Sequence, residues 1–302
     1  MTAAADAGEQ RRGLLLGLGA YLMWGVVPLF FRLLRDVPPV ETVAHRVLWS
    51  VILLLAIVAA RGGLRSLIGL ARRPGLIAAL TLSAVLIFAN WLVYIWAVVN
   101  DHLVQASLGY FLNPLVNVAL GVAVLKERLS RGQGAAVVLA VVGVVILLTG
   151  SPGGLWVSLT LAFSFGFYGL VRKLVPVGAL EGLAVETALL APLCAGYLWW
   201  ASRTGGLYFG TDGGVDALLV ASALVTSVPL LMFAAAVRRV PYAVIGLIQY
   251  LAPSMVFLQG VFLFGEAVES AKWACFALIW AGLAIVSVEE LVKLRRRRLQ
   301  LA

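Results

Sequence analysis

The chain has 302 residues, of which 62% are hydrophobic and 12% are charged, and its mean hydropathy is +1.02. A soluble globular domain has about half of its residues apolar and about a quarter charged. The composition therefore excludes the soluble classes and indicates an integral membrane protein. The net charge is +9.

Ten apolar segments lie between charged or Gly- and Pro-rich stretches. A helix needs about 20 mostly apolar residues to cross the hydrocarbon of a bilayer, and each segment has about that length. We expect transmembrane helices at residues 13–34, 40–60, 75–99, 104–124, 132–149, 154–171, 180–201, 214–237, 243–264 and 271–291. Prolines inside them are compatible with helix, because neighbouring helices and waters satisfy the backbone groups that proline frees. The sequence predicts an all-α integral membrane fold with ten transmembrane helices.

The two halves of the chain are similar in sequence. Aligned pairs include Pro114 with Pro253, Gly121 with Gly260, Glu127 with Glu266, Gly143 with Gly282, Arg32 with Arg172, and Glu41 with Glu181. Each half holds five expected helices, so the second copy enters the membrane from the opposite side and the repeat is inverted. We assign residues 1–150 to the first five-helix repeat with a short cytoplasmic N-terminus, 151–292 to the second, and 293–302 to a basic cytoplasmic tail. Inverted repeats are typical of secondary transporters with a site between the halves.

The distribution of Lys and Arg predicts that both chain ends are cytoplasmic. With the N-terminus placed in the cytoplasm, the opposite side holds only Arg32, Arg35, Arg203 and Lys272 of the 23 basic residues, and only Arg46 lies within a helix. Cytoplasmic loops carry the excess of Lys and Arg in membrane proteins. The basic tail is explained by this orientation and by anionic headgroups, so we expect membrane lipid and not nucleic acid as its partner. No small-residue cleavage site follows the first apolar segment, which we expect to be a retained span.

Seven runs of sequence carry a resemblance to a known family. They are HRVLWS at 45–50, NWLVYIWAVVN at 90–100, ASLGYFLNPLVN at 106–117, FSFGFYGLVRK at 163–173, VET at 185–187, TSVPLL at 226–231 and QYLAP at 249–253. Together they resemble the RarD family of EamA-type transporters, in the drug/metabolite transporter superfamily. The resemblance implies a ten-helix permease of the bacterial inner membrane, built from five plus five inverted repeats, and members are mainly exporters of small metabolites or drugs.

Three ionisable residues lie near the start of the expected helix 40–60. Glu41 and His45 are four residues apart and share a helix face, and Arg46 lies about 9 Å past the helix start. One interpretation is an outward vestibule in which Arg46 anchors a carboxylate or other anionic group, with Glu41 and His45 as candidate proton carriers. The other is a structural ion pair of Arg46 with Glu41 or with another carboxylate.

Glu186 is equivalent to Arg46 in the repeat alignment. Because the repeat is inverted, about 10 Å along the membrane normal separates the two positions, and a direct pair would need tilt or long side chains. Glu186 is a candidate proton-coupling carboxylate of the inner half, because burial favours its protonated form. The alternative is a carboxylate neutralised by hydrogen bonds.

Polar residues recur at helical spacing on the expected helix 104–124, where Tyr110, Asn113 and Asn117 form one stripe. In the repeat alignment, the expected helix 243–264 presents Gln249 and Tyr250 at the corresponding level. We therefore expect these two helices to face each other across the symmetry axis.

The expected helix 75–99 adds Asn90, Trp91 and Tyr94, whose amide and aromatic groups can hold a small amphipathic solute. As a set, the residues of these helices predict a substrate cavity. Any one of them is also explained as an interhelical hydrogen bond, worth about 0.6 kcal/mol on average in a membrane bundle.

Several chemistries find no support in the sequence. There is no Gly-rich phosphate-binding loop ending in Gly-Lys and no His-Glu-x-x-His pattern, and Cys194 and Cys275 lie in apolar segments without metal or redox spacing. We expect no cofactor, no metal and no enzymatic activity.

The sequence predicts a secondary active permease, most simply an exporter of a small solute by alternating access. A flippase or scramblase for a lipid-linked intermediate is the alternative, and an intramembrane enzyme is a more distant one. The oligomeric state is not predicted.

Overall fold

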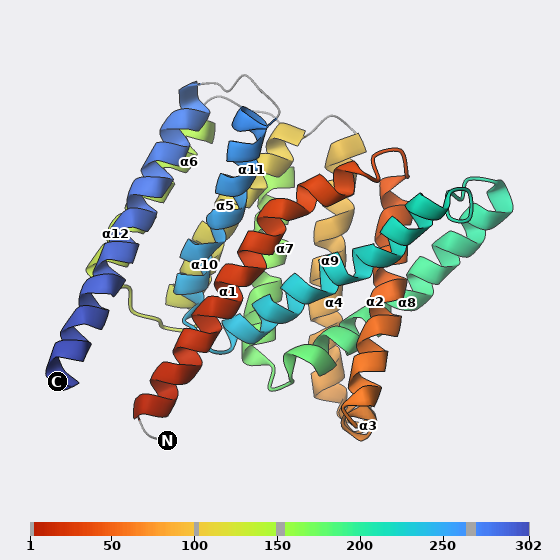
Figure 1. Ribbon diagram of the computed structural model, residues 1–302, viewed down its shortest axis with the longest axis horizontal. Helices are drawn as coiled ribbons and strands as arrows, with labels where there is room; N and C mark the ends of the chain where they lie inside the picture. The colour runs from red at the N-terminus through yellow and green to blue at the C-terminus, as the bar shows by residue number, and fades with distance from the viewer. Residues whose placement is uncertain (1–2, 100–102, 149–154, 264–269, 302) are drawn as a thin grey trace.

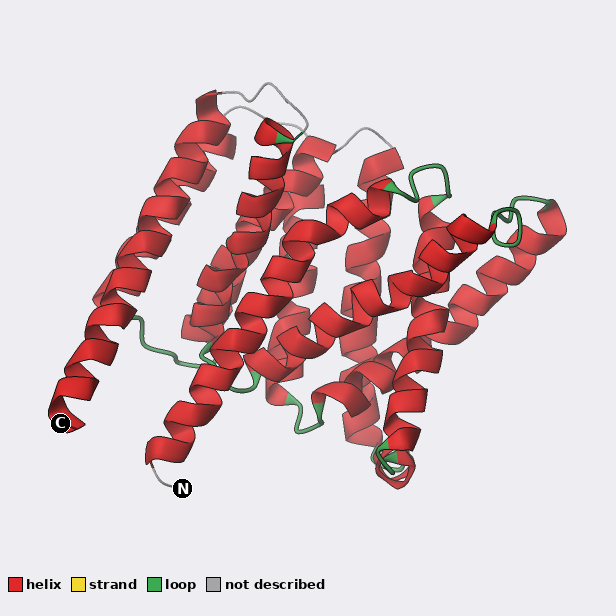
Figure 2. Ribbon diagram, viewed as in Figure 1, coloured by secondary structure: helices red, strands yellow, loops and turns green. Residues whose placement is uncertain are grey.

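The computed structural model describes residues 3–99, 103–148, 155–263 and 270–301, and every regular element in these ranges is a helix (Figures 1 and 2). The helices are α1 (Ala3–Arg32), α2 (Pro39–Ala60), α3 (Leu64–Ala71), α4 (Pro74–Val99), α5 (Leu103–Ala123), α6 (Arg131–Leu148), α7 (Leu155–Leu174), α8 (Ala179–Thr204), α9 (Gly213–Val237), α10 (Tyr242–Gln249), α11 (Leu251–Phe262) and α12 (Ser270–Leu301). Each of the ten expected segments corresponds to one long helix, or to α10 and α11 together.

Six helices among the described residues are long and apolar enough to cross a membrane. They include Gly8–Arg32, Pro39–Ala60, Pro74–Tyr94, Ala179–Thr204, Gly213–Val237 and Tyr242–Gln259. Gly109–Ala123, Arg131–Ile146 and Trp273–Glu289 are shorter apolar helices. This arrangement is that of an all-α integral membrane protein, as the composition predicts.

Three features of the helices differ from the expected ones. The short helix α3 occupies residues expected to form a loop, and within it only Leu70 is buried. The expected helix 243–264 is divided at Tyr250, because Pro253 has no N–H to continue the hydrogen bonding and is tolerated in the first turn of a new helix. Helix α12 continues to Leu301, through the segment expected to be a separate tail. Glu266, the expected counterpart of Glu127, lies outside the described residues.

The first helix of each repeat packs against the other repeat. Helix α1 contacts α9 and α11, whereas α7 contacts α4 and α5. Helices α2 and α8, which are equivalent in the two repeats, also pack against each other. The largest buried cluster contains Tyr21, Tyr168, Phe233 and Tyr242, which come from α1, α7, α9 and α10. The core is therefore shared between the repeats, and both chain ends lie on one side of the bundle (Figure 1).

Helices α6 and α12 are repeat equivalents and lie side by side at the edge of the bundle (Figure 1). Gly143 of α6 faces the backbone of Cys275, where an added Cβ would lie 3.2 Å from the carbonyl oxygen. Its counterpart Gly282 faces the backbone of Ala136, with a corresponding distance of 3.1 Å to Cα. Small residues at such positions let membrane helices approach closely, so the repeated glycines explain this contact from both sides.

Replacing Gly143 by Leu should separate α6 from α12. The larger side chain meets backbone atoms that cannot move alone, and overpacking of this kind costs about 1–3 kcal/mol. We expect a lower midpoint of thermal unfolding in detergent. Gly134→Leu, on the same helix but with no atom within 4 Å of an added Cβ, is the matched control and should change the midpoint little. Equal losses in the two variants would contradict the packing role of Gly143.

Candidate functional site

Glu41 joins α2 to the segment between α8 and α9. Its Oε1 accepts hydrogen bonds from the backbone N–H groups of Tyr208 (2.9 Å) and Phe209 (3.0 Å), and it lies 3.8 Å from Nε2 of His45. The His45 ring stacks on the Phe209 ring, with 4.7 Å between the centroids. Pro39 begins α2 and places Glu41 in its first turn. The carboxylate is thus engaged in holding a loop of the second repeat.

Arg46, one turn further along α2, contacts aromatic rings. Its guanidinium carbon lies 4.0 Å from the centroid of the Trp91 ring and 6.0 Å from that of Phe31. Its Nε is buried without a hydrogen-bond partner. Among the described residues, no carboxylate lies within ion-pair distance of Arg46. Neither the pair with Glu41 nor a pair with Glu186 is present.

Two tyrosines lie close to this guanidinium. Tyr94 of α4 and Tyr110 of α5 meet edge to face, with 5.9 Å between their ring centroids, and both lie near the Arg46 side chain. Their side chains keep exposed fractions of 38% and 41%. Arg46, Trp91, Tyr94 and Tyr110 therefore form one group, which we call the Arg46 site, on α2, α4 and α5.

Two asparagines bind α4 and α5 to α7. The amide nitrogen of Asn90 donates to the Leu161 carbonyl (2.9 Å) and to the Ser164 hydroxyl (3.0 Å). The amide nitrogen of Asn113, in the orientation that satisfies both of its polar atoms, donates to the carbonyls of Ala162 (3.0 Å) and Leu161 (3.2 Å). In this state both amides are occupied by interhelical hydrogen bonds.

The expected contact between the polar stripes of the two repeats is present. Asn117 of α5 donates to Oε1 of Gln249 at the end of α10, at 2.6 Å. The Tyr21 hydroxyl of α1 donates to the same oxygen at 3.4 Å. Tyr250 donates to the carbonyl of Phe111, its repeat equivalent, at 3.3 Å. These groups join α1, α5 and the junction between α10 and α11.

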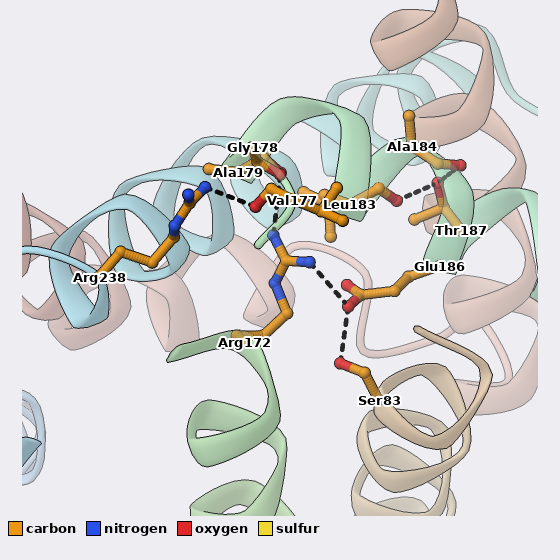
Figure 3. A network of polar contacts seen from close by, with 10 residues as sticks. All are labelled: Ser83, Arg172, Val177, Gly178, Ala179, Leu183, Ala184, Glu186, Thr187 and Arg238. Carbon is orange, nitrogen blue, oxygen red and sulfur yellow. Dashed lines mark hydrogen bonds and ion pairs between the residues drawn. The ribbon is translucent and has the colours of Figure 1, made fainter. Parts of the chain in front are cut away.

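Glu186 of α8 lies in a second polar group (Figure 3). Helix α8 begins on the side of the bundle that carries both chain ends (Figure 1). Ser83 of α4 donates to its Oε1 at 2.6 Å, and Nη1 of Arg172 lies 3.4 Å from the same oxygen. Nη2 of Arg172 donates to the carbonyls of Gly178 (3.2 Å) and Ala179 (3.4 Å). We call Ser83, Arg172 and Glu186 the Glu186 cluster.

Sequence reasoning did not single out Arg172. The expected helix 154–171 ends just before it, whereas the structure places it in the last turn of α7 with an exposed fraction of 0%. The signal was its alignment with Arg32 in the other repeat. Lys173 likewise turns inward and lies 3.6 Å from Oε1 of Glu127.

Two apolar grooves lie on the helix surface. One, of about 270 Å³, is lined by Val40, Val43, Ala44, Phe88, Leu193, Cys194 and Tyr197. The other, of about 260 Å³, is lined by residues of α5 and α7. Neither lining includes a charged side chain that would bind a lipid headgroup. The described residues contain no group of three or more potential metal ligands.

Comparison with known proteins places this arrangement in a family. The model of the EamA-like transporter family matches residues 11–149. Protein RarD of Streptomyces exfoliatus is 48% identical over 97% of this chain and 93% of its own length. Protein RarD of Escherichia coli K12 is 42% identical over 96% and 99%, and an uncharacterized transporter of Pseudomonas aeruginosa is 46% identical over 95% and 96%.

A solved crystal structure with 23% sequence identity superposes with a TM-score of 0.71, over 91% of this chain and 97% of the other. At this identity the likeness concerns the fold, and it extends over nearly the whole bundle. The chain belongs to the RarD family of EamA-type membrane transporters, within the drug/metabolite transporter superfamily.

The contacts of Gln249 and Tyr110 predict different losses of stability when each side chain is removed. Gln249→Ala leaves the buried amide of Asn117 without its partner, and an unsatisfied buried polar group costs about 1–3 kcal/mol. We expect a lower midpoint of thermal unfolding for this variant. Tyr110→Ala removes a partly exposed ring and should lower the midpoint less. A larger loss of stability for Tyr110→Ala than for Gln249→Ala would contradict this prediction and show that the Tyr110 ring is needed for packing.

Proposed function

We propose that this transporter is a secondary active permease of the bacterial inner membrane that exports a small organic solute bearing a carboxylate or another anionic group. The observation that carries the proposal is Arg46, a cation inside the bundle that has no carboxylate partner among the described residues. Ionisable residues at membrane depth are expensive and face a partner, a cavity or a substrate path. An anionic solute would supply the partner that the described residues do not.

The rings around Arg46 support the same proposal. A guanidinium over the face of Trp91 is stabilised by the ring and keeps its N–H groups directed outward from it. The accessible surface of Tyr94 and Tyr110 offers apolar contact and hydroxyl groups to the remainder of the solute. Anchoring by charge and contact by aromatic faces suit a small amphipathic anion.

The inverted repeats support alternating access as the mechanism. In the proposed cycle the Arg46 site opens to one side of the membrane at a time, as the repeats exchange conformations. Asn90, Asn113, Asn117, Gln249 and Tyr250 hold the helices around this site and rearrange with them. Glu186 is the proposed proton-coupling residue, and Glu41 with His45 is the second candidate pair for that role.

A flippase for a lipid-linked intermediate remains the second proposal, because both grooves have apolar linings. Uncharged linings favour the soluble anion over a lipid with a charged headgroup. Uptake assays with soluble organic anions, beside assays that follow the movement of labelled lipid between leaflets, separate the two.

Replacing Arg46 by Gln should weaken transport of anionic solutes by roughly 10- to 100-fold, because a hydrogen bond to a charged group is worth about 1.5–3 kcal/mol. The measurement is uptake of a mixture of small organic anions into inside-out vesicles, read by mass spectrometry. Arg203→Gln is the matched control, since the Arg203 guanidinium also lies over a tryptophan, 5.8 Å from the Trp199 centroid. Unchanged uptake in the Arg46 variant would remove Arg46 from the site.

The proposed orientation places both termini, α3 and the α7–α8 connection in the cytoplasm, as the Lys and Arg distribution predicts. In a background with Cys194 and Cys275 replaced by Ala, Asp212→Cys should react with an impermeant maleimide added outside cells. Arg65→Cys should react only after the membrane is opened. The reverse pattern would invert the topology.

A further inference from the structure

Helix α3 connects the ends of two membrane-spanning helices. The span in α2 ends at Ala60, and the span in α4 begins at Pro74 and runs back through the bundle. A segment between two such ends lies at the surface of the membrane, where the hydrocarbon meets the headgroups. Figure 1 shows α3 at this end of α2 and α4, on the side of the bundle that carries both chain ends.

One side of α3 packs against the rest of the protein. Leu67 packs against the largest buried cluster. Leu70 is buried in one cluster with Leu80 of α4 and with Val175 and Val177 of the α7–α8 connection. These contacts fix the position of α3 on the bundle, and they determine which of its sides remains uncovered.

A second apolar side of α3 is uncovered. Leu64 and Ile68 lie one turn apart on the same side of the helix, and their exposed fractions are 49% and 58%. In a helix surrounded by water, polar residues are expected on the exposed side. At a membrane surface, the apolar residues of an amphipathic helix instead enter the boundary between the headgroups and the acyl chains.

Four arginines lie on or beside α3. Arg65 is in its first turn, Arg61 precedes the helix, and Arg72 and Arg73 follow it. All four are exposed, and no ion pair joins them to another described residue. Residues 42–100 contain no Asp or Glu. The positive charge at α3 is therefore not balanced by carboxylates of its own segment.

Other basic residues on the same side of the bundle have partners within the protein. Lys173 lies 3.6 Å from Oε1 of Glu127, and Arg239 donates to Glu9 at 2.8 Å. An excess of Lys and Arg on one side of the membrane thus does not require that these residues lack an anionic partner. The arginines of α3 differ in having no such partner and in lying beside exposed apolar side chains.

We propose that α3 and its flanking arginines form a binding site for an anionic phospholipid. The guanidinium groups bind the lipid phosphate, because a guanidinium matches phosphate oxygens with two parallel hydrogen bonds. Leu64 and Ile68 contact the upper part of the acyl chains. Each Lys or Arg close to an anionic leaflet strengthens such binding by about fivefold.

This lipid site is distinct from the Arg46 site. Arg46 lies near the beginning of α2, and α3 follows its other end. A lipid bound at α3 holds the α2–α4 connection of the first repeat at the membrane surface. Through Leu70, it also stabilises the position of the α7–α8 connection of the second repeat.

The test uses the full chain in vesicles that contain phosphatidylglycerol and phosphatidylcholine in equal amounts. In parallel samples, one or the other lipid carries a photoactivatable diazirine in its acyl chain, and the crosslinked residues are identified by mass spectrometry of peptides. The measured quantity is the ratio of phosphatidylglycerol to phosphatidylcholine crosslinks at residues 64–68. Mapping separates α3 from the basic tail, and identical leaflets make the orientation of the protein irrelevant.

We expect this ratio to be about fivefold or more in the parent protein. Replacing both Arg65 and Arg72 by Gln should lower it several-fold. Arg35→Gln and Arg203→Gln, which remove the same charge at the opposite ends of the spanning helices, should leave it unchanged. Raising the salt concentration from about 0.1 M to about 1 M should lower the ratio in the parent, because the screening length falls from about 10 Å to about 3 Å.

A ratio close to one in the parent would overturn the lipid site and would leave the arginines of α3 to an acidic protein or to orientation alone. A high ratio that survives both the double replacement and the high salt concentration would also overturn it. Should the double variant fail to insert in the membrane, the salt dependence of the parent decides. The result is independent of the proposed transport activity, since uptake of organic anions is measured in separate vesicles.

Discussion

In the hydrocarbon of a membrane, a polar side chain has no water to bind, so its partner must come from the protein, either from its own helix or from another one. Among the described residues, many of the partners on other helices lie across the boundary between the two repeats. Asn90 and Asn113 bind the backbone of α7, Asn117 binds Gln249, and Ser83 binds Glu186. The repeats are thus held together by many short, directional bonds as well as by apolar packing, and a change in their relative position must exchange several of these bonds at once.

Arg46 and Arg172 show two ways to hold a cation inside such a bundle. Arg172 is partnered by a carboxylate and by two backbone carbonyls. Arg46 lies against aromatic rings that stabilise its charge without using its hydrogen-bond donors. The partners of Arg172 belong to the protein itself, whereas the guanidinium of Arg46 keeps charged N–H donors available for a ligand. This difference is the reason for assigning the substrate to Arg46 and not to Arg172.

Much of the fold follows from the sequence, because apolar length and repeat alignment each constrain it strongly. The alignment also predicted that α5 faces α10, and the hydrogen bond between Asn117 and Gln249 lies in that contact.

The sequence could not identify the acceptors of Asn90 and Asn113, since these are backbone carbonyls and any helix offers them. Arg172 was placed outside the membrane because charge alone marked the end of the helix. Its burial depends on Glu186 and on the return of the chain at Gly178, which no local pattern reveals. The break at Tyr250 depends on Pro253, and proline alone does not distinguish a kink from a new helix.

The packing of α1 against α9 and α11 has a consequence for how the protein is made. A chain is inserted from its N-terminus onward, so the first helix enters the membrane long before the helices that cover it are synthesised. Until then Tyr21 has no Gln249 to bind, and the surface of α1 that will be buried faces lipid or the insertion machinery. Contacts between segments so distant in sequence form late and slowly. Completion of the bundle must therefore wait for nearly the whole chain. In a truncated product, the face of α1 that should be buried has no α9 and α11 to cover it.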